Sequence, residues 1–157
     1  MQKINPFFWF DNRAEEAAKF YTSIFKNSSI RSIARYPEGS PGPAGTVMTV
    51  TFDLDGQTFI ALNGGPVFKF TEAISFFVNC ATQEEVDSLW EKLSASGEPG
   101  QCGWLKDKFG VSWQIVPRAL IEMLQDKDAA RSKRVVQAML QMKKLDINGL
   151  RQAYEQE

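Results

Sequence analysis

The sequence predicts an α+β fold built from two related β-α-β-β-β modules and a helical C-terminal tail. Apolar and polar residues alternate from Met48 to Leu54, as in a half-buried strand. Asp55–Gly56 follows at once and is a strong hairpin-turn signal. Two amphipathic helical segments with acidic first turns match at an offset of 69 residues, with Ala17 on Val86. Such a repeat indicates a structural duplication.

The first module, residues 1–66, is expected to hold one helix and four strands. Its elements are expected in this order: a strand at 4–10, a helix ending near 26–27, and strands at 29–36, 48–54 and 57–63. Asp11 or Asn12 is expected to cap the helix. The proline- and glycine-rich residues 37–45 favour neither strand nor helix, so a loop is expected there.

The second module, residues 72–117, repeats this order. A strand at 73–80, a helix ending at Gly97 and strands at 104–106 and 111–116 are expected, with a loop and a turn between them. Thr82 and Glu85 form a capping box at the helix start. Trp90 falls where the first helix has Tyr21, which supports the duplication.

Residues 118–157 form a tail whose composition favours helices. The expected helices lie at 119–124, 129–142 and 146–154. The tail is expected to pack on the domain or on a second subunit; a methionine-rich face that binds partners is the alternative. We expect the whole chain, 1–157, to be one domain.

The composition of the chain argues against nucleic-acid binding and membrane insertion. The chain has 18 basic and 19 acidic residues and a formal net charge of -1, so no basic field favours nucleic acid. No apolar run reaches the length of a membrane span, and the N-terminus does not resemble a signal peptide. A cytoplasmic protein is therefore expected, with Cys80 and Cys102 reduced.

The sequence contains no histidine. Histidine is the commonest metal ligand and the usual proton shuttle near neutral pH. Without histidine, the chain cannot form a catalytic Ser–His or Cys–His pair, and it cannot form a 2-His-1-carboxylate metal site. We therefore expect no metal site and no cofactor, and no catalytic residue is assigned.

Several motifs carry a family resemblance. They are Pro6–Asp11 (PFFWFD), Ala14–Ala17 (AEEA), Phe20–Tyr21, Gly103–Asp107 (GWLKD) and Phe109–Pro117 (FGVSWQIVP). The sequence resembles the glyoxalase/bleomycin-resistance (vicinal oxygen chelate) superfamily over about residues 4–117. Within it, the PhnB-like branch labelled 3-demethylubiquinone-9 3-methyltransferase is the most similar.

The resemblance implies two modules whose curved, mixed sheet forms a cleft, a homodimer, and a small-molecule pocket that often lies over a divalent metal. The metal-ligand positions of relatives fall on Gln114, near Asn5, near residues 73–75, and on Leu62 or Asn63. One amide among neutral or apolar residues is a poor metal site, because a divalent ion needs charged ligands. A metal-dependent glyoxalase or dioxygenase activity is therefore not expected.

The methyltransferase label implies a different motif. A Rossmann-type methyltransferase carries a glycine-rich turn between its first strand and the following helix. The only glycine pair here, Gly64–Gly65, ends a strand and leads into Pro66. The sequence therefore does not favour S-adenosylmethionine binding.

The predicted ligand pocket combines aromatic and polar residues: Phe7, Trp9, Asn63, Ser75, Phe77, Trp104 and Gln114. Each of these aromatic residues could instead pack only in the hydrophobic core. The same two alternatives apply to Trp113. Gln114 is either a polar anchor of the pocket or a buried amide bonded to backbone. Asp107 is expected to shape its turn.

Two functions are compatible with these residues. The first is a metal-free module that binds a small molecule. The second is an enzyme acting on a small metabolite, with a carboxylate or tyrosine as the acid–base group.

Overall fold

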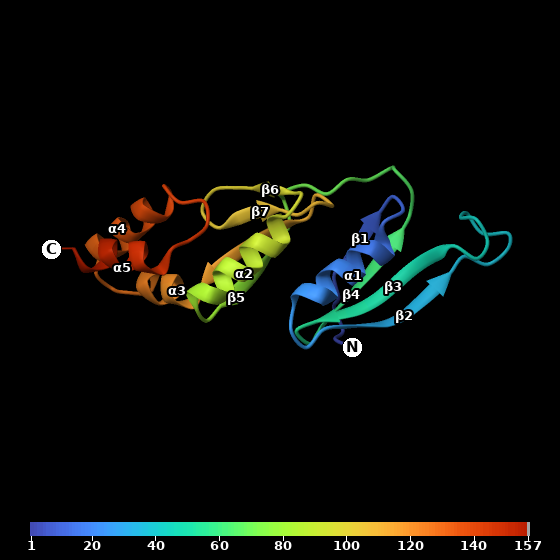
Figure 1. Ribbon diagram of the computed structural model, residues 1–157, viewed down its shortest axis with the longest axis horizontal. Coiled ribbons are helices and arrows are strands. Elements are labelled where there is room, and N and C mark those ends of the chain that lie inside the picture. Colours follow the sequence, from blue (N-terminus) through green and yellow to red (C-terminus); the bar gives the residue numbers. More distant parts are fainter. Residues whose placement is uncertain (157) are drawn as a thin grey trace. The chain divides into compact units, whose positions relative to one another are not determined.

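The computed structural model describes residues 1–156 and divides them into two compact units. The first unit is Met1–Lys69, and the second begins at Phe70 and includes the rest of the described chain. Each unit has a mixed four-stranded sheet with a helix across one face (Figure 1).

The first unit contains one β-α-β-β-β module. Its elements are β1 (Phe7–Phe10), α1 (Ala14–Ile24), β2 (Ser29–Arg35), β3 (Val47–Leu54) and β4 (Gln57–Asn63). The sheet order is β1-β4-β3-β2, with β1 parallel to β4 and the other pairs antiparallel. Asp55 and Gly56 have φ values of 46° and 83°, which confirms the predicted tight turn between β3 and β4.

The core of the first unit lies between α1 and the sheet. Tyr21 of α1 is fully buried and stacks on Phe52, with ring centroids 6.3 Å apart. Phe52 stacks in turn on Phe59 at 5.6 Å. Alanines at positions 14, 17 and 18 are also fully buried, so the helix can approach the aromatic layer closely. The helical spacing in the sequence therefore predicted the buried face correctly.

The predicted cap of this helix is wrong. The N-cap residue is Arg13, not Asp11 or Asn12, and its side chain makes no capping hydrogen bond. The first helical N–H, on Ala14, instead donates to the side-chain oxygen of Asn63 at 2.8 Å. The helix is thus capped by a residue at the end of β4.

The second unit repeats the module. Its elements are β5 (Ser75–Cys80), α2 (Gln83–Ser94), β6 (Glu98–Pro99), β7 (Trp104–Lys106) and β8 (Ser112–Pro117). The sheet order is β5-β8-β7-β6, with β5 parallel to β8. This order is equivalent to that of the first sheet, so the predicted duplication is confirmed. The two-residue β6 lies in a segment that we expected to be loop.

The capping box of α2 forms as predicted, with a small shift. The backbone N–H of Glu85 donates to Thr82 Oγ1 at 3.2 Å. Glu85 Oε2 accepts from the backbone N–H of Ala81 at 2.8 Å, one residue before the N-cap. The helix ends at Ser94, three residues before the predicted end at Gly97, and Ser96 has a positive φ of 60°.

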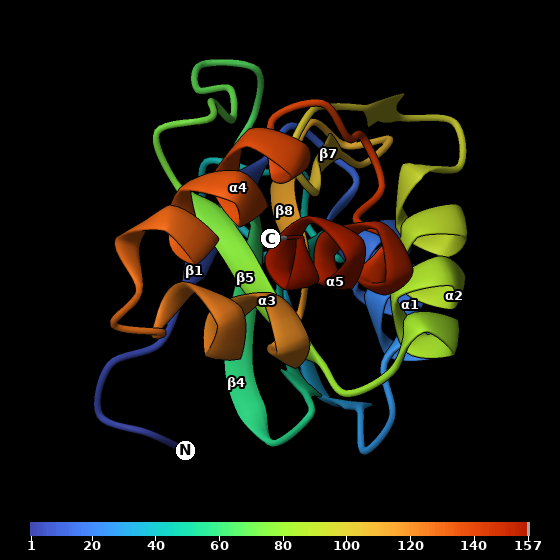
Figure 2. The same ribbon diagram turned by 90° about the vertical axis from the view of Figure 1, so that its left-hand side faces the viewer.

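The tail forms three helices, which Figure 2 shows gathered together: α3 (Arg118–Leu124), α4 (Ala129–Met139) and α5 (Ile147–Glu155). Val135, Leu145 and Leu150 are fully buried in a cluster that also contains Val116 at the end of β8. The α4 helix ends three residues before the predicted limit, because the chain turns there toward the start of β7. The tail thus packs on its own unit.

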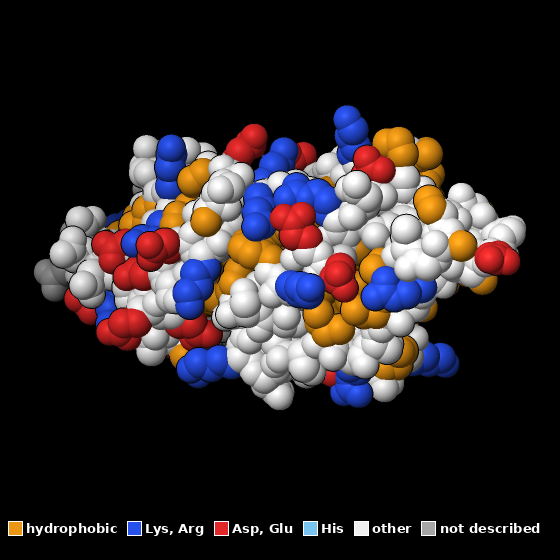
Figure 3. Space-filling view, turned by 45° about the vertical axis from the view of Figure 1, so that its right-hand side comes forward, with side chains coloured by type: hydrophobic (Ala, Val, Ile, Leu, Met, Phe, Trp, Pro, Cys, Tyr) orange, Lys and Arg blue, Asp and Glu red, His pale blue; other side chains and the backbone are white. Residues whose placement is uncertain are grey.

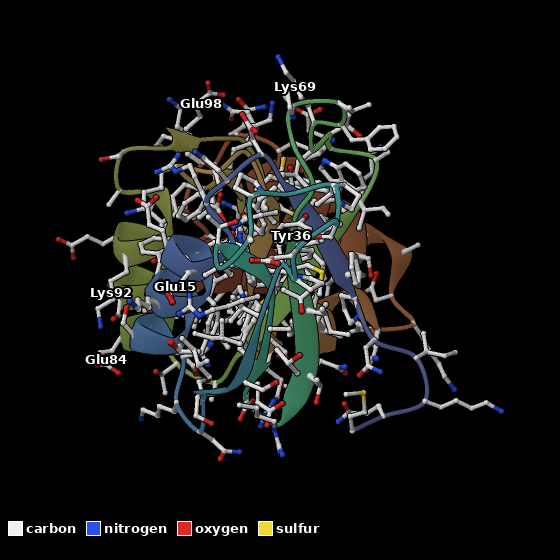
Figure 4. All side chains as sticks on the ribbon, turned by 90° about the vertical axis from the view of Figure 1, so that its right-hand side faces the viewer. Glu15, Tyr36, Lys69, Glu84, Lys92 and Glu98 are labelled. Atoms are coloured by element: carbon white, nitrogen blue, oxygen red, sulfur yellow. The ribbon has the colours of Figure 1, made fainter. Side chains whose placement is uncertain are left out.

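Charges of both signs are interspersed on one face of the described residues. On the face shown in Figure 3, basic and acidic side chains alternate among small apolar areas. Glu84 and Lys92 project outward from α2 (Figure 4). No helix within residues 1–156 is long and apolar enough to cross a membrane.

Candidate functional site

The open face of the second sheet gathers four of the predicted pocket residues. Side chains alternate between the two faces of a strand. Trp113 and Ile115 are buried on the α2 side, so Gln114 lies on the opposite, open face. The strand register places Phe77 of β5 and Trp104 of β7 on either side of Gln114. We call Ser75, Phe77, Trp104 and Gln114 the aromatic–amide cluster.

The Gln114 amide is held in place by its neighbour. Its Nε2 donates to Ser75 Oγ at 2.9 Å. Its Oε1 accepts no hydrogen bond from any described residue and remains available as an acceptor. Phe77 is 51% exposed and Trp104 is half-buried, so both rings present apolar surface beside this oxygen. The cluster combines one oriented polar group with two aromatic rings.

The open face of the first sheet carries Phe7 and Trp9. In the register, Phe7 is the partner of Ile60 and Trp9 that of Leu62. Trp9 Nε1 donates to Gly65 O at 2.9 Å, and the Trp9 ring meets Phe68 edge-on with centroids 4.9 Å apart. The structure therefore brings Phe7 and Trp9 onto one apolar face of their own sheet.

Asn63 lies on the opposite face of the first sheet from Phe7 and Trp9. It is the register partner of Phe10, so it points to the α1 side of its sheet. Its Oδ1 accepts from Ala14 N, and its Nδ2 donates to Val47 O at 3.2 Å. Its backbone oxygen accepts from the Tyr36 hydroxyl. These bonds engage the Asn63 side chain in the local structure.

A cavity of about 670 Å³ lies beside Asn63 in the first unit, and the sequence analysis did not anticipate it. Tyr36 and Glu15, both labelled in Figure 4, line it together with residues 41–43 and the start of α1. Glu16 accepts from Arg13 at 2.8 Å, and Glu15 lies 3.7 Å from Lys19. The proline- and glycine-rich loop was the only sequence signal for this cavity.

Asp53 is a buried carboxylate on the open face of the first sheet that sequence reasoning missed. Thr58 Oγ1 donates to Asp53 Oδ1 at 2.8 Å, and Arg31 pairs with Oδ2. Burial raises the pKa of Asp53, but the Thr58 and Arg31 hydrogen bonds outweigh that effect and hold the pKa below its usual range. Both carboxylate oxygens therefore have protein partners.

Asp107 shapes the turn before β8, as predicted. Its Oδ1 accepts from the backbone N–H groups of Phe109 and Val111, at 2.8 and 3.1 Å. Its Oδ2 accepts from Trp113 Nε1 at 2.9 Å. Trp113, one of the residues that could have been pocket or core, is 2% exposed and belongs to the core.

The donor set does not fit a divalent metal ion. No group of three Cys, Asp or Glu residues able to hold a metal occurs within residues 1–156. The aromatic–amide cluster offers an amide and a hydroxyl, and Asp53 is already engaged by Arg31 and Thr58. Neutral donors alone cannot offset the dehydration of such an ion.

The two units contain the same β-α-β-β-β module with equivalent strand orders, as expected for a glyoxalase-like α+β fold. The sequence pattern of the 3-demethylubiquinone-9 3-methyltransferase family matches residues 2–116. The chain belongs to that family.

Several solved structures are similar to this chain. The PhnB protein of Bacillus cereus is 44% identical, with a TM-score of 0.67 over 74% of this chain and 99% of that one. A protein from Staphylococcus aureus is 35% identical, with a TM-score of 0.35 over 73% and 94% of the two chains. A protein from Pseudomonas aeruginosa shares the fold at 19% identity, with a TM-score of 0.62 over 74% and 98%. No curated protein sequence matches the chain.

Proposed function

We propose that this protein binds a small, planar, oxygen-substituted aromatic molecule at the aromatic–amide cluster, without a metal ion. The observation that carries the proposal is the oriented Gln114 amide between the exposed Phe77 ring and Trp104. Apolar pockets with a few placed polar groups are typical of small-molecule sites. The name of the family, which refers to a quinone, favours this ligand class.

Each residue of the cluster has a separate part in the proposed binding. Phe77 and Trp104 stack on the ligand ring, which removes their exposed apolar surface from water. Gln114 Oε1 accepts a hydrogen bond from a ligand hydroxyl, and Ser75 fixes the orientation of the amide. Phe7 and Trp9, on the first sheet, are not part of this proposed binding site.

Calorimetric titration with a short-chain, water-soluble methoxybenzoquinone and with its hydroquinone tests the proposal. We expect saturable binding of one molecule per chain, tighter for the hydroquinone and unchanged by EDTA. Gln114→Leu keeps the side-chain size but removes the acceptor, so affinity should fall about tenfold. Gln137→Leu, at an exposed position on α4, is the matched control. Absence of binding, or equal affinity in Gln114→Leu, would contradict the proposal.

A homodimer is also proposed. The open faces carry large apolar side chains, with Phe7 55% and Phe77 51% exposed, and Ile74 beside β5 is 71% exposed. Pairing with a second copy would remove such surface from water. Sedimentation equilibrium should give twice the chain mass of 17.7 kDa at micromolar concentration. A single-chain mass under those conditions would count against pairing.

Methyl transfer is the second candidate, because the matching family carries that name. The residues between β1 and α1, Asp11–Arg13, include no glycine, and the first helical N–H is taken by Asn63. A glycine-rich phosphate- or nucleotide-binding turn therefore does not form there. Titration with S-adenosylmethionine should show no binding, and micromolar binding would favour methyl transfer instead.

A further inference from the structure

The segment between α4 and α5 is bonded directly to the loop that precedes Trp104. The backbone N–H of Cys102 donates to Met142 O, and that of Gly103 donates to Lys143 O, both at 2.8 Å. These bonds join the tail to the start of β7. Trp104, part of the aromatic–amide cluster, is the next residue along the chain.

Gly103 is tightly enclosed at this junction. Its φ of 82° lies in the left-handed region, which favours glycine. A Cβ atom there would lie 2.9 Å from Leu145 Cδ1 and 3.0 Å from Ile115 O. Gly103 O also accepts from Ile115 N at 2.8 Å. The residue before Trp104 is therefore fixed between β8 and the tail.

The tail segment is itself anchored to α2. Gln83 Nε2 donates to Leu145 O at 3.0 Å, and Gln83 Oε1 accepts from Ile147 N at 2.7 Å. Lys144 pairs with Asp87 at 2.9 Å, and hydrogen bonds from Lys144 and Gln83 lower the pKa of Asp87. One side chain, Gln83, thus holds Leu145 and Ile147, which closely follow the residues that bond to Cys102 and Gly103.

The tail also closes one end of the open face. Val116 lies on the same face of β8 as Gln114, two residues further along. It is only 4% exposed, because it packs in a cluster with tail residues such as Leu120, Leu145 and Leu150. The tail therefore begins where the aromatic–amide cluster ends.

We propose that the C-terminal tail sets the position of Trp104 and bounds the ligand site, with Gln83 as the positioning residue. This inference rests on the proposed binding function. The family pattern ends at residue 116, and the match to the Bacillus cereus protein uses 99% of that chain, which leaves almost nothing there to correspond to the tail. The tail therefore lies outside the family pattern, and its contacts with Cys102 and Gly103 are additional to that pattern.

The full-length variant Gln83→Ala tests the positioning, and a double variant that adds Lys144→Gln removes both anchors. Glu84→Ala, at the exposed neighbouring position, is the matched control. Amide exchange at Cys102 and Gly103 reports tail docking. The fluorine resonance of 5-fluorotryptophan at Trp104, assigned with Trp104→Phe, reports the position of the ring. Titration with the methoxybenzoquinone and its hydroquinone reports binding.

We expect Gln83→Ala to increase amide exchange at Cys102 and Gly103 and to shift the Trp104 fluorine resonance. The Trp9 resonance should stay unchanged. Affinity should fall about fivefold, since a hydrogen-bonded anchor is lost. Retained protection in the double variant would overturn the proposal. So would increased exchange with an unchanged Trp104 resonance and affinity. If the native chain binds neither probe, the proposed function fails, and the Trp104 resonance still decides the positioning.

Discussion

Gln114 donates a hydrogen bond from Nε2 to Ser75 Oγ across the parallel pair β5–β8, at 2.9 Å. The bond determines which end of the amide remains available, because the nitrogen is engaged and Oε1 accepts from no described residue. A neutral side chain thereby offers a fixed acceptor between two aromatic residues. This is the relationship on which the proposed ligand class depends.

Ser75→Ala should weaken binding without unfolding the protein. The Gln114 amide would lose its orientation and could rotate, so affinity for the hydroquinone should fall about threefold to fivefold. Calorimetric titration measures the affinity, and thermal unfolding should shift only slightly. Ser32→Ala, at an exposed position on β2, is the control. Equal affinity in Ser75→Ala would show that the Ser75 bond does not orient the amide.

Asn63→Ala should destabilise the fold by about 1–2 kcal/mol, because α1 loses its cap and Val47 O loses a donor. Urea unfolding measures the free energy of unfolding. Asn12→Ala is a matched control, since Asn12 was the cap expected from sequence but makes no such bond. A larger loss of stability in Asn12→Ala than in Asn63→Ala would contradict the structure.

Asp107→Ala should cost about 2–4 kcal/mol of stability. Two backbone N–H groups and the buried Trp113 Nε1–H would lose their acceptor. Asp107→Asn should cost less, because its oxygen can still accept from one side. Urea unfolding of both variants checks this order, and a neutral Asp107→Ala would refute the role given to the carboxylate.

Acid should remove part of the stability through Asp53. Its folded-state pKa is lower than the unfolded value near 3.8, so its contribution is present above that value. The contribution is lost as pH falls from the unfolded pKa through the lower folded pKa. Urea unfolding between pH 2 and 6 should show a flatter acid limb for Asp53→Asn than for the native protein. Parallel acid limbs would mean that Asp53 is not stabilised by Arg31 and Thr58.

The two cysteines should differ in reactivity. Burial, with a smaller contribution from Glu85, raises the pKa of the Cys80 thiol to about 12. Since the thiolate is the reactive form, Cys80 should stay inert to a disulfide reagent at pH 8. Cys102 is partly exposed and should react first. A variant with Cys102→Ser should therefore show no rapidly reacting thiol, and rapid reaction would place Cys80 at the surface.

The module pattern could be predicted because it depends on local signals. The Met48–Leu54 alternation, the Asp55–Gly56 turn and the capping box at Thr82 each act within a few residues of the chain. The order of elements along the second module followed from its similarity to the first. These signals predicted the helix of each module, every long strand and the order of elements that the two modules share.

The remaining features depend on contacts between distant residues. Asn63 caps a helix that begins 49 residues earlier in the chain, so no local pattern could favour it over Asp11 or Asn12. The α4 helix ends at Met139, earlier than its composition indicates, and Lys143 O accepts from the distant Gly103 N instead. The Gln114–Ser75 bond likewise depends on the register of two strands that are far apart in sequence.

The side-chain amide resonances of Gln114 and Asn63 provide the most direct test of the proposed site. Titration of the native protein with the hydroquinone, in EDTA, can be followed in an NMR spectrum assigned with Gln114→Leu and Asn63→Ala. The Gln114 amide should shift progressively to saturation, while the Asn63 amide, bonded to Ala14 and Val47, stays in place. A shift of Asn63 with Gln114 unmoved would place binding elsewhere and contradict the account.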